Sequence, residues 1–85
     1  LHPANTLSLH DALPIWKEAL VIYNKAIEVD ITRSIAYFGK SKVCMAMGNR
    51  IIALTYAAKA YELEPENEWY KCHYNVLKNM YIGLN

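Results

Sequence analysis

Apolar residues recur along most of this chain at the three- and four-residue steps of an amphipathic helix. From Trp16 to Val29 they fall on one face, while lysine, glutamate and asparagine fill most of the other. The same spacing predicts three further helices, over residues 34–47, 50–63 and 68–82. The connections between them are only a few residues long, so neighbouring helices are expected to run antiparallel.

Residues at the ends of these segments predict how each helix starts or stops. Gly48 is expected to end the second helix in a left-handed conformation. Ser34 and Asn67 are placed to cap the helices that follow them. Gly39 lies inside a predicted helix, where it lowers helix propensity, so we expect it to serve a close contact.

Residues 1–15 do not share the pattern, because they show no sustained helical period and contain Pro3 and Pro14. The part from Thr6 to Ile15, TLSLHDALPI, resembles the in-frame translation of a sequencing adapter. We therefore expect residues 1–15 to be a non-native or irregular arm. The natural chain is then expected to start further upstream.

The stretch Trp16–Ile31 is echoed 34 residues later by Arg50–Pro65. Five pairs at this spacing are identical: Ala19/Ala53, Leu20/Leu54, Lys25/Lys59, Ala26/Ala60 and Glu28/Glu62. A fixed period of this length is typical of helical repeat proteins, in which each repeat packs against the next.

The pattern resembles the tetratricopeptide repeat. The matching residues are Tyr37, Ser41, Gly48, Ala53, Ala60 and Pro65, all within residues 34–67. The resemblance implies an all-α, antiparallel helix-turn-helix solenoid with about four helices. Residues 16–33 would be the second helix of a truncated repeat, 34–67 a complete repeat, and 68–85 the first helix of a third repeat or a C-terminal capping helix.

The sequence departs from the family pattern at Ile31, Lys40, Cys44 and Ala57. The register of the last helix is also open, because either Trp69 or a residue just after it can begin the repeat. An unrelated array of antiparallel helical hairpins is the alternative fold.

Composition narrows the class of protein. Apolar residues make up 54% of the chain and the net charge is +1, so neither a disordered tail nor a nucleic-acid partner is indicated. No apolar run reaches the length of about 20 residues that crosses a bilayer, so no membrane partner is expected. Two cysteines without a secretory signal favour free thiols and a cytoplasmic location.

The sequence gives little support for an enzyme, a metal site or a cofactor. His73 follows Cys72, but adjacent helical residues point about 100° apart and do not face each other. We therefore expect His73 to be packed or interfacial, and Cys44 to be a small buried apolar residue. The glutamates at 62, 64, 66 and 68 are expected to form a solvated acidic corner.

What remains is binding of a protein or peptide. The resemblance implies a concave, mostly apolar groove on the first helices of successive repeats, formed by Ile35, Phe38, Lys42, Met45, Trp69, Cys72, Val76 and Asn79. Phe38 and Trp69 can instead pack between helices, and Lys42 alone does not make a chaperone carboxylate clamp. The alternative function is a structural solenoid segment of a larger protein with no ligand of its own. Loss of the helix before Trp16 would expose apolar surface and favour self-association.

Overall fold

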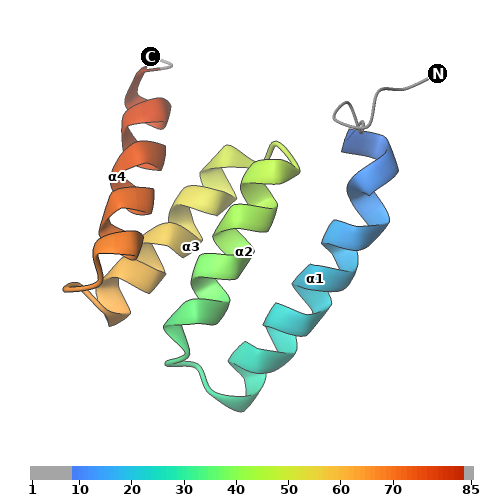
Figure 1. Cartoon of the computed structure of the whole chain (residues 1–85), viewed down its shortest axis with the longest axis horizontal. Coiled ribbons are helices and arrows are strands. Elements are labelled where there is room, and N and C mark those ends of the chain that lie inside the picture. The colour runs from blue at the N-terminus through green and yellow to red at the C-terminus, as the bar shows by residue number, and fades with distance from the viewer. Residues whose placement is uncertain (1–8, 84–85) are drawn as a thin grey trace.

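The chain folds into four helices, which a computed structural model describes over residues 9–83, with side-chain surroundings over 14–80. They are α1 (Leu9–Val29), α2 (Ser34–Ala46), α3 (Arg50–Leu63) and α4 (Glu68–Gly83). No strand occurs within residues 9–83. Each helix packs against the one before it, and α1 and α4 lie at the two ends of the array (Figure 1). The predicted all-α class is confirmed.

Helix α1 begins earlier than predicted. It starts at Leu9 and runs through Pro14, so the prediction of an irregular arm up to residue 15 was wrong for residues 9–15. Pro14 is the sixth residue of the helix, where its ring keeps a helix-compatible φ but removes one hydrogen bond of the ladder, and the helix nevertheless continues to Val29. Residues 1–8 lie outside the described part of the chain, and the adapter resemblance stays a prediction.

Two of the predicted helix ends are confirmed. Gly48 has a φ of +83°, the left-handed conformation that favours glycine. The side-chain oxygen of Asn67 accepts from the backbone N–H groups of Trp69 and Tyr70, at 3.0 and 3.3 Å. Asn67 therefore caps α4, as its position suggested.

The predicted cap at Ser34 was wrong. Arg33 occupies the N-cap position in an extended conformation and makes no side-chain cap hydrogen bond. Ser34 is instead buried, where its hydroxyl donates to the Glu64 carboxylate and lies 3.5 Å from the Tyr70 hydroxyl. Ser34 thus links the start of α2 to the α3–α4 connection. Glu64, one of the four glutamates of the predicted acidic corner, is therefore hydrogen-bonded to another part of the chain.

The core is built on small residues of α3. Ala53, Ala57 and Ala60 are all fully or almost fully buried, which lets the neighbouring helices approach closely. Cys44 and Leu77 join the first two alanines in one cluster. Tyr37 and Tyr70 join Ala60 in a second cluster. Large aromatic rings thus fill the space beside the alanines.

The sequence echo has a structural counterpart. Ala19, Leu20 and Ala26 of α1 are half-buried, and their equivalents in α3 lie on the face that contacts the core. Gly39 of α2 faces Tyr23 of α1, and a Cβ built on this glycine would lie 2.7 Å from the Tyr23 hydroxyl oxygen. The close contact predicted for Gly39 is therefore confirmed.

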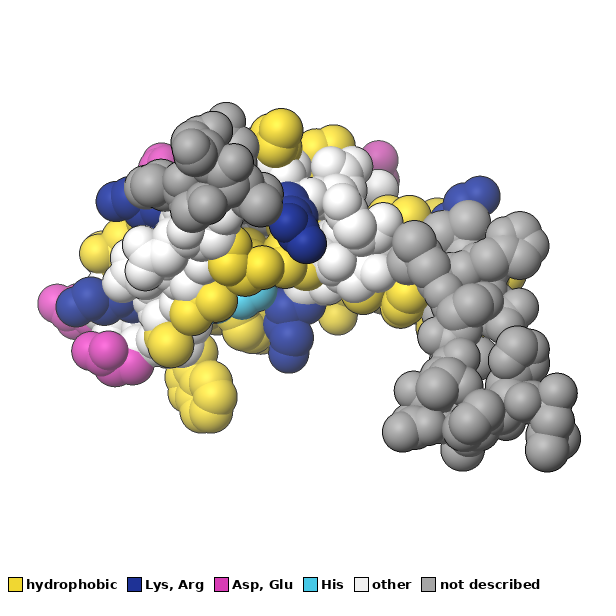
Figure 2. Space-filling view, turned by 90° about the horizontal axis from the view of Figure 1, so that it is seen from above, with side chains coloured by type: hydrophobic (Ala, Val, Ile, Leu, Met, Phe, Trp, Pro, Cys, Tyr) yellow, Lys and Arg dark blue, Asp and Glu magenta, His cyan; other side chains and the backbone are white. Residues whose placement is uncertain are grey.

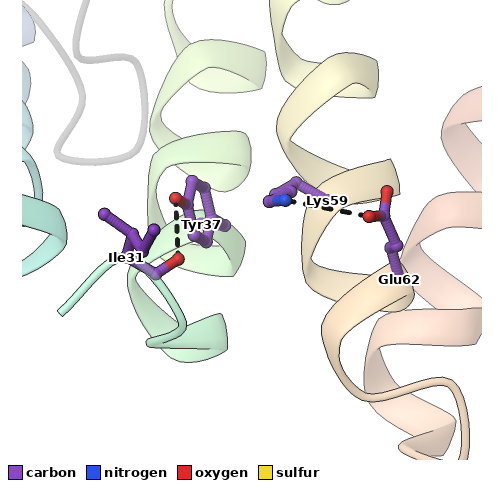
Figure 3. Close-up of polar contacts among 4 residues, drawn as sticks. All are labelled: Ile31, Tyr37, Lys59 and Glu62. Carbon is purple, nitrogen blue, oxygen red and sulfur yellow. Dashed lines mark hydrogen bonds and ion pairs between the residues drawn. The ribbon is translucent and has the colours of Figure 1, made fainter.

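Polar contacts fix the loop end of α2 and the surface of α3 (Figure 3). The Tyr37 hydroxyl donates to the Ile31 carbonyl oxygen at 3.0 Å, which ties the buried ring to the α1–α2 connection. Lys59 and Glu62 form an exposed ion pair at 3.7 Å. An exposed pair of this kind contributes at most about 1 kcal/mol, and it lies within α3. The hydrogen bond from Tyr37 is the one that links α2 to the α1–α2 connection.

Candidate functional site

Among the residues of the predicted groove, Phe38 makes the side-chain contacts that join α2 to α4. The Phe38 ring contacts Tyr70, with ring centroids 4.9 Å apart, and the edge of His73, at 5.1 Å. Phe38 is half-buried rather than enclosed. The ring therefore joins the two helices and still presents part of its surface to solvent.

His73 is held by a hydrogen-bond chain that starts in the core. Ser41 is fully buried, and its hydroxyl donates to the Ala53 carbonyl oxygen at 2.6 Å. The same oxygen lies 2.8 Å from Nε2 of His73. Because the hydroxyl proton is engaged, Ser41 accepts here, and His73 must carry its proton on Nε2.

Burial lowers the pKa of His73 below the ordinary value of 6.5, and the nearby positive charge of Lys42 lowers it further. His73 is therefore neutral at pH 7. Its predicted place at an interface is confirmed. Cys72, the neighbouring residue, is exposed, so the two side chains do not form a pair.

Lys42 is the one charged residue of the predicted groove. Its side chain is exposed, and its Nζ lies 5.3 Å from the centre of the Phe38 ring. In the described part of the chain the single ion pair joins Lys59 and Glu62, so Lys42 has no carboxylate within ion-pair distance there. An ammonium group on an aromatic face, without a counter-ion, can accept an acidic group from a ligand.

The remaining α2 residues of the predicted groove differ in exposure. Ile35 is 55% exposed, although it is a large apolar residue. Met45 is half-buried and packs against the cluster of Cys44 and Ala53. Ile35 is thus a surface residue, whereas Met45 is shared between the surface and the core.

The α4 residues of the predicted groove are all exposed. Trp69 is 79% exposed, so it does not pack between helices, and Val76 is 50% exposed. At about 100° per residue, both lie within a quarter-turn or so of Tyr70 and Leu77, which are buried.

Cys72 and Asn79 lie almost opposite the buried face of α4. Of the eight predicted residues, contacts within the described part of the chain join Phe38 to Lys42. Cys72 and Asn79 are not brought to that pair.

The spacing of buried residues bears on the register of α4. Ala36 and Gly39 lie on the buried side of α2, and Gly39 faces α1. The residues 34 positions later are Tyr70 and His73, which contact α2. Gly39 of α2 and His73 of α4 are 34 residues apart, and each faces a helix that comes earlier in the chain, α1 and α2 respectively. The other four buried residues of α2, Ser34, Tyr37, Ser41 and Cys44, have exposed residues 34 positions later, so the 34-residue spacing of burial holds for Ala36 and Gly39 alone.

Two contributions to the surface were missed at the level of sequence. His73 contacts Phe38 directly, and Met80 is 39% exposed one turn beyond Val76. Figure 2 shows hydrophobic side chains gathered around a histidine, with basic side chains nearby. Met80 lies seven residues after His73, so a helical wheel of α4 places the two side chains on the same face. The helical period could therefore have predicted that they are neighbours.

The described residues offer little for other chemistry. Burial raises the pKa of the Cys44 thiol, although the charge of Lys40 opposes the shift, so the unreactive protonated form is favoured. No group of three potential metal ligands is found among the described residues. Across residues 9–83, no helix combines the length and apolar character that crossing a membrane requires.

Comparison with known proteins gives no relative for this chain: no family model, curated protein or solved structure matches it significantly.

Proposed function

We propose that this chain is a protein-interaction module of the tetratricopeptide type. In this proposal a peptide or partner helix binds along the side of α2 and α4 that carries Ile35, Phe38, Lys42, Trp69 and Val76. The chain acts by binding rather than by catalysis, and it works in the cytoplasm. The observation that carries the proposal is the exposure of Trp69, a large aromatic side chain, on the same helix as Tyr70 and His73, which contact Phe38.

Three features support this function. Large aromatic residues supply much of the binding energy at protein interfaces, and Trp69 presents 79% of its surface to solvent. The proposed binding surface lies on the helices α2 and α4, so a ligand does not have to order the backbone there. Finally, Lys42 adds one charge to an otherwise apolar surface, which suits an apolar or aromatic peptide with an acidic group.

The alternative is a structural segment that only extends a longer solenoid. Phe38 favours this alternative, because its contacts with Tyr70 and His73 give it a packing role within the chain. Trp69 does not, since a residue exposed to this degree contributes little to the fold described here. The two functions therefore differ most clearly in what Trp69 does.

A random heptapeptide library displayed on phage tests the proposal. The chain is immobilised, and the selected peptides are synthesised and titrated into isotope-labelled protein. We expect the backbone amide signals of α2 and α4 around Phe38 and Trp69 to shift, with α1 unaffected. A library that yields no binder, or peptides that shift signals elsewhere, would contradict the groove.

A substitution pair separates binding from folding. Trp69→Ala removes the exposed ring, and Ile51→Ala removes an apolar side chain of α3 that is 64% exposed and lies outside the groove. We expect Trp69→Ala alone to weaken the selected peptides. Equal loss in both variants would assign the effect to general surface apolarity.

A further inference from the structure

Helix α1 carries an apolar stripe that no other described element covers. Ile15, Ile22 and Val29 are 63%, 66% and 84% exposed and follow one another at seven-residue spacing. Seven residues are almost two helical turns, so the three side chains lie nearly in line. Leu20, Tyr23 and Ile27, which face the rest of the chain, lie about 130° away around the helix. Figure 1 shows α1 at one end of the array, with α2 on one side.

The stripe is symmetric about Ile22. Ile15 lies seven residues before it and Val29 seven residues after it. If two copies of α1 pack antiparallel around a two-fold axis at Ile22, the Ile22 side chains meet. Ile15 of each copy then meets Val29 of the other. A self-complementary surface of this kind is what a two-fold dimer requires.

The charges beside the stripe obey the same symmetry. Glu18 and Lys25 are both exposed and lie seven residues apart, so they are on the same flank of the stripe. A two-fold axis perpendicular to the helices brings like flanks together. Glu18 lies four residues before Ile22 and Lys25 three residues after it. In the antiparallel pair, Glu18 of one copy and Lys25 of the other therefore differ in position along the helix axis by only one residue, or about 1.5 Å. The match of opposite charges distinguishes a second copy from an unrelated partner.

The other flank is suited to close approach. Ala19 lies three residues before Ile22 and Ala26 four residues after it, so the same axis places these small residues together. Small side chains let two helix backbones approach, and the isoleucine and valine side chains can then interdigitate.

We propose that α1 is a homodimer interface, in which two copies of this chain pack antiparallel with Ile22 at the two-fold axis. The surface lies on α1 and is separate from the groove of α2 and α4, so either proposal can fail without the other. The contact is limited to one helix face, so we expect a small interface and a weak dimer that forms only at high protein concentration.

Sedimentation of the whole chain from micromolar to millimolar concentration tests the dimer. We expect a monomer–dimer equilibrium that Ile22→Glu abolishes, because it places two like charges at the axis. The residue is largely exposed, so circular dichroism of Ile22→Glu should show an intact helical fold. A wild-type chain that stays monomeric throughout this range, or a dimer that Ile22→Glu does not weaken, would overturn the proposal.

Charge reversal tests the antiparallel register. Glu18→Lys and Lys25→Glu should each weaken the dimer by about 2- to 30-fold, since each disturbs two symmetry-related pairs. The double variant E18K/K25E should restore it. Lys17→Glu is the matched control, because it makes the same charge change on an exposed α1 residue well away from the stripe. A double variant as weak as the single ones would contradict this register.

Discussion

Ser41 and His73 connect α2 to α4 through one hydrogen bond, with 2.8 Å between the serine hydroxyl oxygen and Nε2 of the imidazole. Ser41 in turn donates to the Ala53 carbonyl oxygen of α3. Three helices are therefore joined at one buried hydroxyl. Both the neutral Nε2–H form and the protonated form of His73 can donate to Ser41, so protonation does not break this bond.

Protonation of His73 should nevertheless destabilise the fold. Its pKa in the folded chain is lowered by burial and by Lys42, so the folded state binds fewer protons than the unfolded state just below pH 6.5. The free energy of unfolding is then highest above this pH and decreases as pH falls through the lowered pKa of the folded state. Urea unfolding at a series of pH values between neutrality and pH 5 measures this decrease.

His73→Gln is the control for that series. Glutamine can still donate an amide N–H towards Ser41, but it does not titrate. The variant should show a smaller loss of stability between neutral and mildly acidic pH. If its pH profile matches that of the wild type, another group causes the decrease.

Gly39→Ala should destabilise the chain because its new Cβ meets the ring of Tyr23. Overpacking costs about 1–3 kcal/mol, and the better helix propensity of alanine returns about 1 kcal/mol. We expect a net loss of about 1 kcal/mol in the free energy of unfolding. In a Tyr23→Ala background the clash disappears and Gly39→Ala should become stabilising. A substitution that has the same effect in both backgrounds would exclude this contact as the reason for the glycine.

Asn67→Ala should remove the cap of α4. The asparagine side chain accepts from two backbone N–H groups, and loss of such a cap costs about 1 kcal/mol. Asn67→Asp keeps the acceptor and should retain most of the stability. Hydrogen exchange of the first turn of α4 reports the effect locally, and unchanged protection in Asn67→Ala would contradict the capping role.

Trp69 and Tyr70 are adjacent in sequence and should respond in opposite ways to truncation. Trp69→Ala should change the free energy of unfolding by no more than about 0.5 kcal/mol, because the ring is mostly exposed. Tyr70→Ala should cost about 3 kcal/mol, because the ring is buried against Phe38 and Ala60. Chemical denaturation of both variants measures the contrast, and similar losses would mean that Trp69 is part of the core.

The sequence predicted the helices and their order because the apolar period and the short connections are local features. It also predicted the buried Cys44, the left-handed Gly48 and the cap at Asn67, each from a single residue and its neighbours. The predicted start of α1 is too late because the prediction counts Pro3 and Pro14 against a helix, whereas a long helix can include a proline at the cost of one hydrogen bond.

Tertiary contacts explain the other differences. The position of Ser34 predicts a cap, but in the fold its hydroxyl contacts Glu64 and Tyr70. The position of His73 against α2 depends on Ser41, which lies 32 residues earlier in the chain. No local pattern brings these two residues together. The partial burial of Phe38 likewise results from its contacts with α4.

The most direct measurement is the affinity of a library-selected peptide for the wild type, Trp69→Ala and Ile51→Ala, determined by calorimetry alongside their unfolding free energies. We predict that Trp69→Ala weakens binding by about tenfold or more, as expected for an aromatic residue central to an interface, and leaves the fold intact. Ile51→Ala should bind like the wild type. Equal affinity of all three proteins would contradict the groove of α2 and α4 as the binding site.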